Sequence, residues 1–141
     1  MIKQRKDNVK PTLYLIRGVP GAGKTTFANM LNSRLLVDRV YEADQYFYGY
    51  DGTYKFDATK LSNAHEQCQR NTRKALSEGL SVAVSNTSCA EWEVETYQNI
   101  ASEYDANFVS IIVENRNCND SVHNVPIEKI EQMKKKFSIK L

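Results

Sequence analysis

Residues 12–26 have the sequence TLYLIRGVPGAGKTT, and this stretch decides the fold. The apolar run at 12–17 is typical of a buried strand, and the pattern that begins at Lys24 is typical of a helix to about Leu36. The turn between them, residues 18–25, matches G-x-x-x-x-G-K-[ST] in full. Such a turn can surround a phosphate with backbone N–H groups, and the helix N-terminus adds a partial positive charge. The stretch therefore predicts a phosphate-binding loop.

The residue types in this loop predict how it would hold a nucleoside triphosphate. Lys24 is predicted to contact the β- and γ-phosphates of ATP, and the Thr25 hydroxyl to bind Mg²⁺. The alternative is a glycine-rich turn that contains Lys-Thr by coincidence, which the strand before it and the helix after it disfavour. The residues predicted to contact the nucleotide are Gly18, Pro20, Gly21, Ala22, Gly23, Lys24, Thr25 and Thr26.

The rest of the chain alternates apolar runs with helical patterns. Strands are predicted near 37–43, 80–85 and 107–114, and helices near 58–78, 90–103 and 126–137. Asp57 is predicted to cap the second helix and Gly79 to end it. Ser88 and Glu91 have the spacing of a capping box at the start of the third. Strands joined by helices pair in parallel, so the predicted fold class is α/β: a three-layer α/β/α P-loop NTPase fold with a mainly parallel sheet of about four strands.

Length and composition indicate one compact domain. The 141 residues are 41% hydrophobic and 26% charged, which is typical of a globular protein and not of a disordered one. The domain is assigned to residues 12–137, between a basic N-terminal tail at 1–11 and a C-terminal tail at 138–141. The net charge of +2 combines +3 over residues 1–10, +4 over 129–141 and −5 between them. Basic ends would suit a polyanionic partner or form a solvated helix face.

Apolar runs and cysteine spacing predict where the protein resides. No run approaches the roughly 20 apolar residues that cross a bilayer, so neither a membrane anchor nor a secretory signal is predicted. Cys68, Cys89 and Cys118 show neither a disulfide framework nor zinc-binding spacing. The predicted location is therefore the reducing cytoplasm. The pattern does not indicate an oligomeric state.

Polar side chains that follow the second and third predicted strands are expected beside the phosphate loop, because ligands of parallel sheets bind at the carboxyl ends of the strands. Asp44 there could accept a proton from an attacking hydroxyl or act through the metal, or be a solvated loop acid. Ser-Asn-Thr-Ser at 85–88 could bind Mg²⁺ through water, contact an acceptor, or form a strand-to-helix turn. The chain has no Asn-Lys-x-Asp of guanine-reading GTPases and no strand that ends in the Asp-Glu of motor ATPases.

Taken together, these segments resemble the small P-loop kinases related to polynucleotide 5′-hydroxyl kinase and their stand-alone kinase-like relatives. The resemblance covers roughly residues 12–137. Its motifs are, in order, GVPGAGKT at 18–25, Asp-x-Tyr-Phe at 44–47, Ala-His at 64–65, Ser-Asn-Thr-Ser at 85–88, and HNVP followed by IEKI at 123–130. Only the first motif is specific by itself, but all the motifs together and in this order are much stronger evidence for the resemblance.

The resemblance implies catalytic roles for two residues. Asp44 corresponds to the family's general base, which takes the proton from the 5′-hydroxyl of the acceptor. Arg116 corresponds to a lid arginine that closes on the ATP phosphates, with a surface arginine beside Glu114 as the alternative. At Gln45 and Phe47 the polynucleotide kinase has instead a second acid and an arginine that binds substrate phosphate.

Three further residues are predicted to contact the acceptor. His65 belongs to the Ala-His motif, and its alternative is a partly buried structural hydrogen-bond donor. Asn86 stands where the polynucleotide kinase has an aspartate and its small relatives have asparagine. Tyr46 belongs to an aromatic loop whose rings could stack on bases or form a hydrophobic lid over the core.

The leading hypothesis is an ATP-binding, Mg²⁺-dependent phosphotransferase that moves the γ-phosphate of ATP to a hydroxyl or phosphate acceptor, with a polynucleotide or nucleotide 5′-hydroxyl favoured. The predicted catalytic residues are Lys24, Asp44 and Arg116, and the predicted metal ligands are Thr25 and Asp44. The expected partners are a nucleoside triphosphate and a single-stranded nucleic acid or nucleotide, without a membrane. Two alternatives stay open: a nucleotide-binding regulatory or interaction ATPase with little transfer activity, and a nucleoside monophosphate or small-metabolite kinase.

Overall fold

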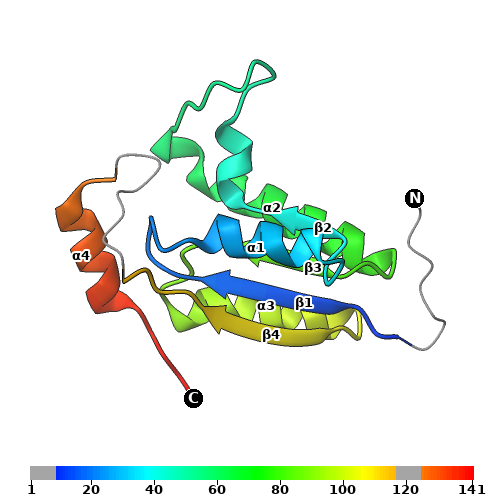
Figure 1. Ribbon diagram of the computed structural model, residues 1–141. Helices are drawn as coiled ribbons and strands as arrows, with labels where there is room; N and C mark the ends of the chain where they lie inside the picture. Colours follow the sequence, from blue (N-terminus) through cyan, green and yellow to red (C-terminus); the bar gives the residue numbers. More distant parts are fainter. Residues whose placement is uncertain (1–8, 117–124) are drawn as a thin grey trace.

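The computed structural model describes residues 9–116 and 125–141 (Figure 1). Over these residues the elements are β1 (Thr12–Arg17), α1 (Lys24–Ser33), β2 (Arg39–Tyr41), η1 (Ala43–Phe47), η2 (Ala58–Lys60), α2 (Leu61–Ser77), β3 (Val82–Ser85), α3 (Glu91–Glu103), β4 (Asn107–Ile112) and α4 (Ile127–Lys136), where η marks a 3₁₀ helix. Cys118, His123, Asn124 and the first eight residues of the predicted basic tail lie outside the described residues.

The described strands form one sheet in the order β2-β3-β1-β4, and every neighbouring pair in it is parallel. Leu13 and Leu15 of β1 are fully buried among residues of α2 and α3. Ile16 of the same strand is buried on the opposite face, among residues of α1 such as Leu31. Because successive strand side chains alternate between faces, one strand serves both cores. The predicted three-layer α/β/α fold is confirmed.

The carboxyl ends of the strands meet at one edge of the sheet, which lies to the left in Figure 1. Ile16 of β1 is in register with Ser85 of β3, and Tyr41 of β2 with Val84 of β3. The loop after β1, the segment after β2 and the turn after β3 therefore begin side by side. Helix α4 lies beyond this edge and not over a face of the sheet (Figure 1).

Helix α1 ends at Ser33, three residues before the predicted end at Leu36. Leu35 has a φ of 61°, and the Leu36 N–H donates to the Leu31 carbonyl over 2.9 Å. Together with the bond from the Leu35 N–H to the Asn32 carbonyl, this is a Schellman motif, which ends a helix through one left-handed residue. Glycine is the usual signal for that residue, so a leucine there gives none.

The predicted capping box at Ser88 and Glu91 is wrong. Helix α3 begins at Glu91 with Ala90 as its N-cap, and the Glu93 carboxylate accepts a hydrogen bond from the Ala90 N–H. Ser88 is fully buried with a φ of 45°, and its carbonyl accepts a bond from Arg17. Half of the pattern exists two residues later, because Ser88 completes the turn after β3 and the Ala90 side chain has no oxygen that could accept the return bond.

The residues predicted to begin and end α2 agree better with the structure. Asp57 accepts a hydrogen bond from the Thr59 N–H over 3.0 Å, although it caps the 3₁₀ turn η2 that leads into the helix. Gly79 has a φ of 77° directly after the helix, as the predicted stop requires. Among the described residues, no helix is long and apolar enough to cross a membrane.

Candidate functional site

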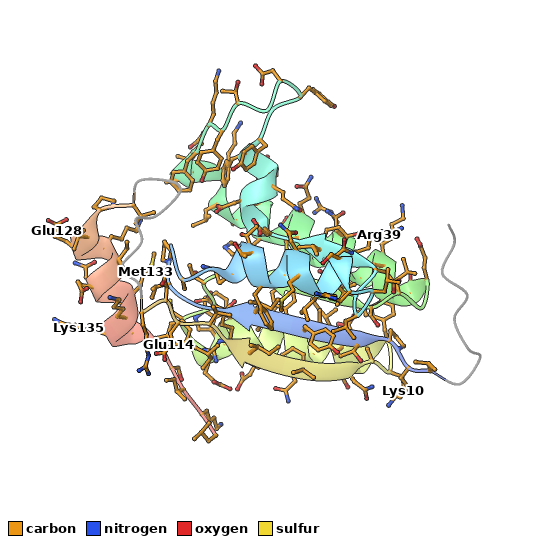
Figure 2. All side chains as sticks on the ribbon, in the orientation of Figure 1. Lys10, Arg39, Glu114, Glu128, Met133 and Lys135 are labelled. Atoms are coloured by element: carbon orange, nitrogen blue, oxygen red, sulfur yellow. The ribbon has the colours of Figure 1, made fainter. Side chains whose placement is uncertain are left out.

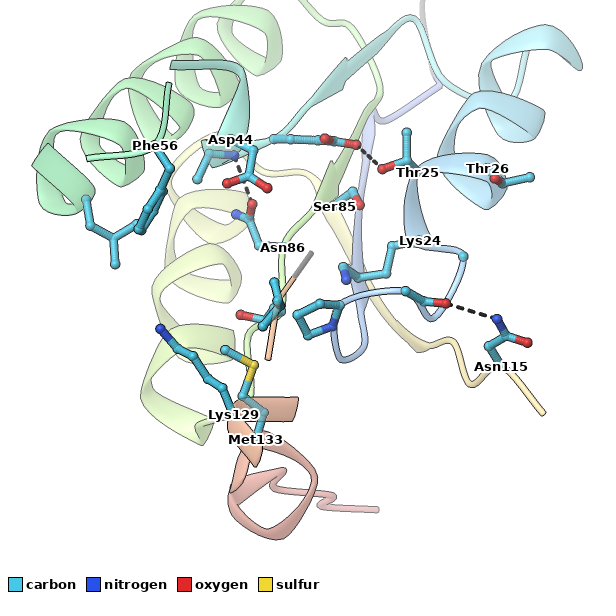
Figure 3. Close-up of a pocket in the computed structure, with 18 of the residues that line it drawn as sticks. Lys24, Thr25, Thr26, Asp44, Phe56, Ser85, Asn86, Asn115, Lys129 and Met133 are labelled. Atoms are coloured by element: carbon cyan, nitrogen blue, oxygen red, sulfur yellow. Dashed lines mark hydrogen bonds between the residues drawn. The ribbon is translucent and has the colours of Figure 1, made fainter. Parts of the chain in front are cut away.

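A cavity of about 580 Å³ opens at the carboxyl edge of the sheet (Figure 3). One side, called here the loop wall, consists of Pro20, Gly21, Gly23, Lys24, Thr25 and Thr26. The opposite side, called the outer wall, consists of Phe56, Leu61 and His65 before and within α2, and of Lys129 and Met133 on α4. Between the walls lie Glu42, Asp44, Ser85 and Asn86 at the ends of β2 and β3.

The loop wall keeps its shape because of two glycines in the phosphate-binding loop, one where a side chain would clash and one where the backbone is left-handed. A Cβ on Gly18 would lie 2.6 Å from the carbonyl oxygen of Val113. The first residue of the loop after β1 must therefore be glycine. Gly23 has a φ of +97°, which places it in the left-handed region immediately before α1. Gly18 and Ala22 are buried beneath the loop and do not line the cavity, unlike the other six predicted nucleotide contacts.

Lys24 and Thr25 of the loop wall each donate one hydrogen bond. The Lys24 ammonium donates a hydrogen bond to the Val19 carbonyl over 3.1 Å. Burial lowers the pKa of Lys24 below its usual range, against the opposing effect of the carboxylates of Glu42 and Asp44. The Thr25 hydroxyl donates to the Glu42 carboxylate over 2.6 Å (Figure 3). Because the Thr25 hydroxyl donates its proton to a hydrogen bond with Glu42, the lone pairs of the Thr25 oxygen stay available for a cation.

Asp44 lies in η1 and lines the cavity, as the strand-end argument predicts. The Tyr54 hydroxyl donates a hydrogen bond to its carboxylate. Burial, and next the Asp44 charge, raise the pKa of Tyr54 to about 12. Tyr54 is held by a short hairpin in which residues 48 and 54 form an antiparallel bridge, and its ring lies 5.0 Å from that of Tyr48 and 6.3 Å from that of Phe47.

Ser85 is the last residue of β3 and Asn86 follows it, but their side chains differ in hydrogen bonding. The Asn86 amide oxygen accepts a hydrogen bond from the Ala43 N–H over 2.9 Å, and its amide nitrogen lies 3.5 Å from the Tyr97 hydroxyl. Asn86 thus fixes the start of η1, which carries Asp44. The Ser85 hydroxyl is buried at the cavity and has no hydrogen-bond partner among the described residues. A buried hydroxyl without a partner is costly, and it indicates a ligand or water at that point.

The structure separates Arg116 from the cavity. Its guanidinium pairs with the Glu114 carboxylate over 2.7 Å, and both side chains are exposed. This is the alternative that the sequence left open, and the described conformation does not place Arg116 at the loop wall. Its neighbour Asn115 takes that place instead, because the Asn115 amide donates to the Gly21 carbonyl over 3.0 Å.

The predicted acceptor contacts are also only partly brought together. His65 and Asn86 line the cavity. Tyr46 does not line it, because it packs edge-on against Phe47 and the hydrophobic core, with 5.4 Å between the ring centroids. The ring that the aromatic loop contributes to the cavity is Phe56, ten residues further along the chain.

Sequence reasoning missed Glu42, Phe56, Lys129 and Met133. Glu42 directly follows β2, so the strand-end argument that selected Asp44 applied equally to it. Lys129 and Met133 are one helical turn apart and share a face of α4. No local pattern shows which face of that helix meets the cavity, since its position depends on a distant contact with Arg17.

That contact joins the end of α4 to the sheet. Arg17 is 3% exposed, and its guanidinium donates to the Ser88 carbonyl over 3.0 Å and to the Ser138 carbonyl over 2.7 Å. It also lies 4.8 Å from the centre of the Phe137 ring. The Ser138 N–H donates in turn to the Cys89 carbonyl. A buried arginine with these partners fixes the segment that follows α4.

Comparison with known proteins indicates the family of the chain. The family described as an AAA domain, AAA_33, matches residues 13–139. NEDD4-binding protein 2 of Homo sapiens is 30% identical over 105 residues, which are 74% of this chain and 6% of that protein. The chain therefore spans only a small part of that relative's length.

Two solved structures share the fold at lower identity. A chain of the Pnkp1/Rnl/Hen1 complex has a TM-score of 0.62 and 18% identity, over 90% of this chain and 40% of that one. The APS kinase CysC of Mycobacterium tuberculosis, solved in complex with AMPPNP and APS, has a TM-score of 0.59 and 15% identity, over 87% of this chain and 68% of that one. These likenesses show a P-loop kinase-like fold. The family match spans almost the whole chain, so the chain belongs to the AAA_33 family of AAA domains.

Proposed function

We propose that the chain is an ATP-binding, Mg²⁺-dependent phosphotransferase that moves the γ-phosphate of ATP to a hydroxyl, with a polynucleotide or nucleotide 5′-hydroxyl as the favoured acceptor. One observation carries the proposal: a single cavity holds a phosphate-binding loop and, between the loop and the outer wall, the Asp44 carboxylate. A nucleotide-binding switch needs the loop alone. A transferase also needs a group that receives the proton of the acceptor, and Asp44 supplies it.

The chemical step uses groups on both sides of the cavity. Asp44 accepts the proton of the acceptor hydroxyl, and the hydroxyl oxygen forms a bond to the γ-phosphorus. The bond from that phosphorus to the bridging β–γ oxygen breaks, and ADP leaves. Lys24 and the backbone N–H groups of the loop stabilise the charge on the transferring oxygens. Tyr54 and Asn86 act through Asp44, the first by a hydrogen bond to its carboxylate and the second by fixing the start of η1.

The residues between the walls suit Mg²⁺ together with ATP. Magnesium prefers oxygen ligands and keeps several of its waters. The Thr25 hydroxyl, the Glu42 carboxylate and the buried, unpartnered Ser85 hydroxyl offer oxygens at one end of the sheet. When bound, the ion neutralises charge on the β- and γ-phosphates. The Ser85 hydroxyl supports this fit most directly, since it lines the cavity and no described residue of the chain bonds to it.

The test is transfer of label from γ-labelled ATP with Mg²⁺ to 5′-hydroxyl DNA, 5′-hydroxyl RNA, mononucleotides and buffer alone, with Lys24→Ala as the blank. We expect label on an acceptor and a rate at least about 100-fold lower for Asp44→Asn, with ATP affinity retained. The matched control is Asp105→Asn, because Asp105 is exposed, pairs only with Lys10 among the described residues and has a left-handed φ that asparagine tolerates.

Three results would overturn the proposal. If the folded protein binds no ATP in Mg²⁺, the loop wall is not a nucleotide-binding site. Asp44→Asn transferring phosphate at the parent rate removes the assigned base. Label that appears only as free phosphate, with every acceptor present, indicates an ATPase and not a transferase.

A further inference from the structure

Strand β4 is an open edge of the sheet. It is the last strand in the order β2-β3-β1-β4, and no described strand lies on its outer side (Figure 1). The Val113 N–H, directly after β4, donates to the Arg17 carbonyl over 2.8 Å, so the odd-numbered residues of this segment direct their backbone groups toward β1. Backbone groups of successive strand residues alternate in direction. Phe108, Ser110 and Ile112 therefore direct their N–H and C=O groups outward.

The two edges of the sheet differ in how they resist pairing with another strand. β2 has only three residues and begins with the exposed Arg39, which Figure 2 labels. β4 has six residues, Asn107–Ile112, without a charged residue or a proline, and Val109 and Ile112 are 38% and 41% exposed. Short length, charge and proline are the usual protections of an edge strand, and β4 has none of them. It is therefore the edge to which a further strand can add.

The sequence of β4 is complementary to itself. From Phe108 it reads Phe-Val-Ser-Ile-Ile, with two apolar residues on each side of the exposed Ser110. In an antiparallel pair of two such strands centred on Ser110, Phe108 lies opposite Ile112 of the second copy. Val109 then lies opposite Ile111, so each of these apolar residues meets an apolar residue. Moving the centre by one residue in either direction would set Ser110 against Phe108 or Ile112 instead.

The charges at the two ends of β4 also suit an antiparallel pair. Just before the strand, Lys10 and Asp105 pair over 3.2 Å. Just after it, Glu114 and Arg116 pair over 2.7 Å. Figure 2 shows Lys10 and Glu114 at opposite ends of the sheet. A two-fold axis at Ser110 brings the first ion pair of one copy to the end where the other copy has its second, so each charge gains an opposite charge nearby.

We propose that β4 is the interface of a two-fold symmetric dimer, in which it pairs in antiparallel orientation with β4 of a second copy of this chain. The register is centred on Ser110, and the two four-stranded sheets become one continuous sheet. An interface that uses the same patch on both copies is closed, so the assembly stops at two chains. The cavity opens at the carboxyl edge of each sheet, so the two cavities lie at opposite ends of the joined sheet. The dimer is thus independent of the proposed transfer reaction.

Sedimentation equilibrium of the full chain over a dilution series measures the dissociation constant of the dimer. We expect the parent protein to approach twice the mass of one chain as its concentration rises. Ser110→Lys sets two ammonium groups against each other at the axis, and we expect it to raise the dissociation constant at least about tenfold. The control is Ser77→Lys, which adds the same charge at another exposed serine, at the end of α2. Urea unfolding checks that both variants are folded.

Cysteine cross-linking tests the register without adding charge. Directly opposite residues of an antiparallel pair have Cα atoms about 4.5–5.5 Å apart, which is within the range of a disulfide. With copper phenanthroline as the oxidant, Ser110→Cys should form a covalent dimer. Val109→Cys, which lies opposite Ile111, and Ser77→Cys should not. The parent protein is the blank, because it has three cysteines of its own.

The inference fails on any of three results. If the parent protein keeps the mass of one chain at every concentration, β4 is not a dimer interface. If Ser110→Lys dimerises as the parent does, the dimer uses another surface. If Val109→Cys cross-links and Ser110→Cys does not, the register is wrong. None of these measurements involves ATP or phosphate transfer, so the dimer and the proposed function can fail separately.

Discussion

The loop wall and the outer wall of the cavity face each other but are built in different ways. The loop wall joins β1 to α1, is fixed by backbone geometry at Gly18 and Gly23, and sits on the buried centre of the sheet. The outer wall comes from the segment after a hairpin and from the helices α2 and α4, none of which is part of the sheet. Side chains hold it: Tyr54 bonds to Asp44, and Arg17 holds the segment that follows α4.

This difference assigns different tolerances to the two sides. A backbone-built wall has one shape and binds the same phosphate groups whatever the acceptor. A side-chain-built wall can change its specificity without disturbing the fold. We therefore expect substitutions in the loop wall to abolish nucleotide binding, and substitutions in the outer wall to change acceptor recognition while ATP affinity persists.

The largest effect is expected from Gly18→Ala. The added Cβ would lie 2.6 Å from the Val113 carbonyl, a backbone atom that can move only with β4. We expect a loss of stability of about 1–3 kcal/mol and no measurable ATP binding, because the loop must shift to relieve the contact. Urea unfolding and calorimetry with ATP check both. Gly52→Ala is the control, since its added Cβ meets nothing within 4 Å. ATP binding at the parent affinity by folded Gly18→Ala would contradict the description of the loop wall.

Glu42→Gln should have the next largest effect, and only in the presence of metal. Glutamine keeps the shape of the side chain and an acceptor oxygen, but it loses the negative charge of the carboxylate that accepts the Thr25 hydrogen bond. We expect the Mg²⁺ concentration that half-saturates ATP binding to rise about tenfold, as for partners of metal ligands in general. ATP affinity in EDTA should not change. Calorimetry across Mg²⁺ concentrations measures both, with the exposed Glu95→Gln as the control. An equal loss with and without metal would assign Glu42 a purely structural role.

Phe137→Ala tests whether the outer wall depends on its side-chain anchor. The ring lies under the Arg17 guanidinium at the end of α4, and such a contact contributes on the order of 1 kcal/mol. We expect the acceptor KM to rise about threefold to fivefold, because Lys129 and Met133 lose a fixed position, while the ATP KM stays the same. Steady-state kinetics on both substrates give the split. Ile139→Ala, at a nearby exposed side chain, should leave both constants unchanged.

The sequence predicted the loop wall far better than the outer wall, for a physical reason. The glycine-rich turn, its strand and its helix are contiguous, so one local pattern contains the whole phosphate cradle. The parallel order of strands then placed Asp44 and Asn86 at the cavity, and the family resemblance added His65 on α2. Arg17, by contrast, bonds to Ser138 across more than a hundred residues, and nothing local shows that contact.

The missed and displaced residues follow the same division. Phe47 and Tyr46 read alike as loop aromatics, yet they turn into the core, while Phe56 reaches the cavity after the chain reverses between residues 48 and 54. Arg116 had a carboxylate two residues away, and that local pair determines its described position. Positions that depend on how a loop folds back were therefore out of reach, whereas positions at strand ends were not.

The smallest effect is expected from Tyr54→Phe, which removes the hydroxyl that donates to Asp44 but keeps the ring against Tyr48 and Phe47. One neutral donor to a carboxylate contributes on the order of 1 kcal/mol, so we expect kcat to fall about threefold to fivefold with both KM values unchanged. A change in the ATP KM would show that the substitution disturbs the loop wall as well.

The same variant has a signature in the pH dependence of stability. Burial, and then Asp44, raise the pKa of Tyr54 from 10.0 to about 12, so the folded state holds this proton more tightly than the unfolded state. The resulting stabilisation is fully present below about pH 10 and is lost as the pH rises to about 12. The stability difference between the parent and Tyr54→Phe should therefore be constant from pH 8 to about 9 and shrink between about 10 and 12, measured by urea unfolding. A difference that stays constant to pH 12 would mean that the Tyr54 hydroxyl is neither buried nor hydrogen-bonded to Asp44, and that the hairpin which carries it does not orient the proposed base.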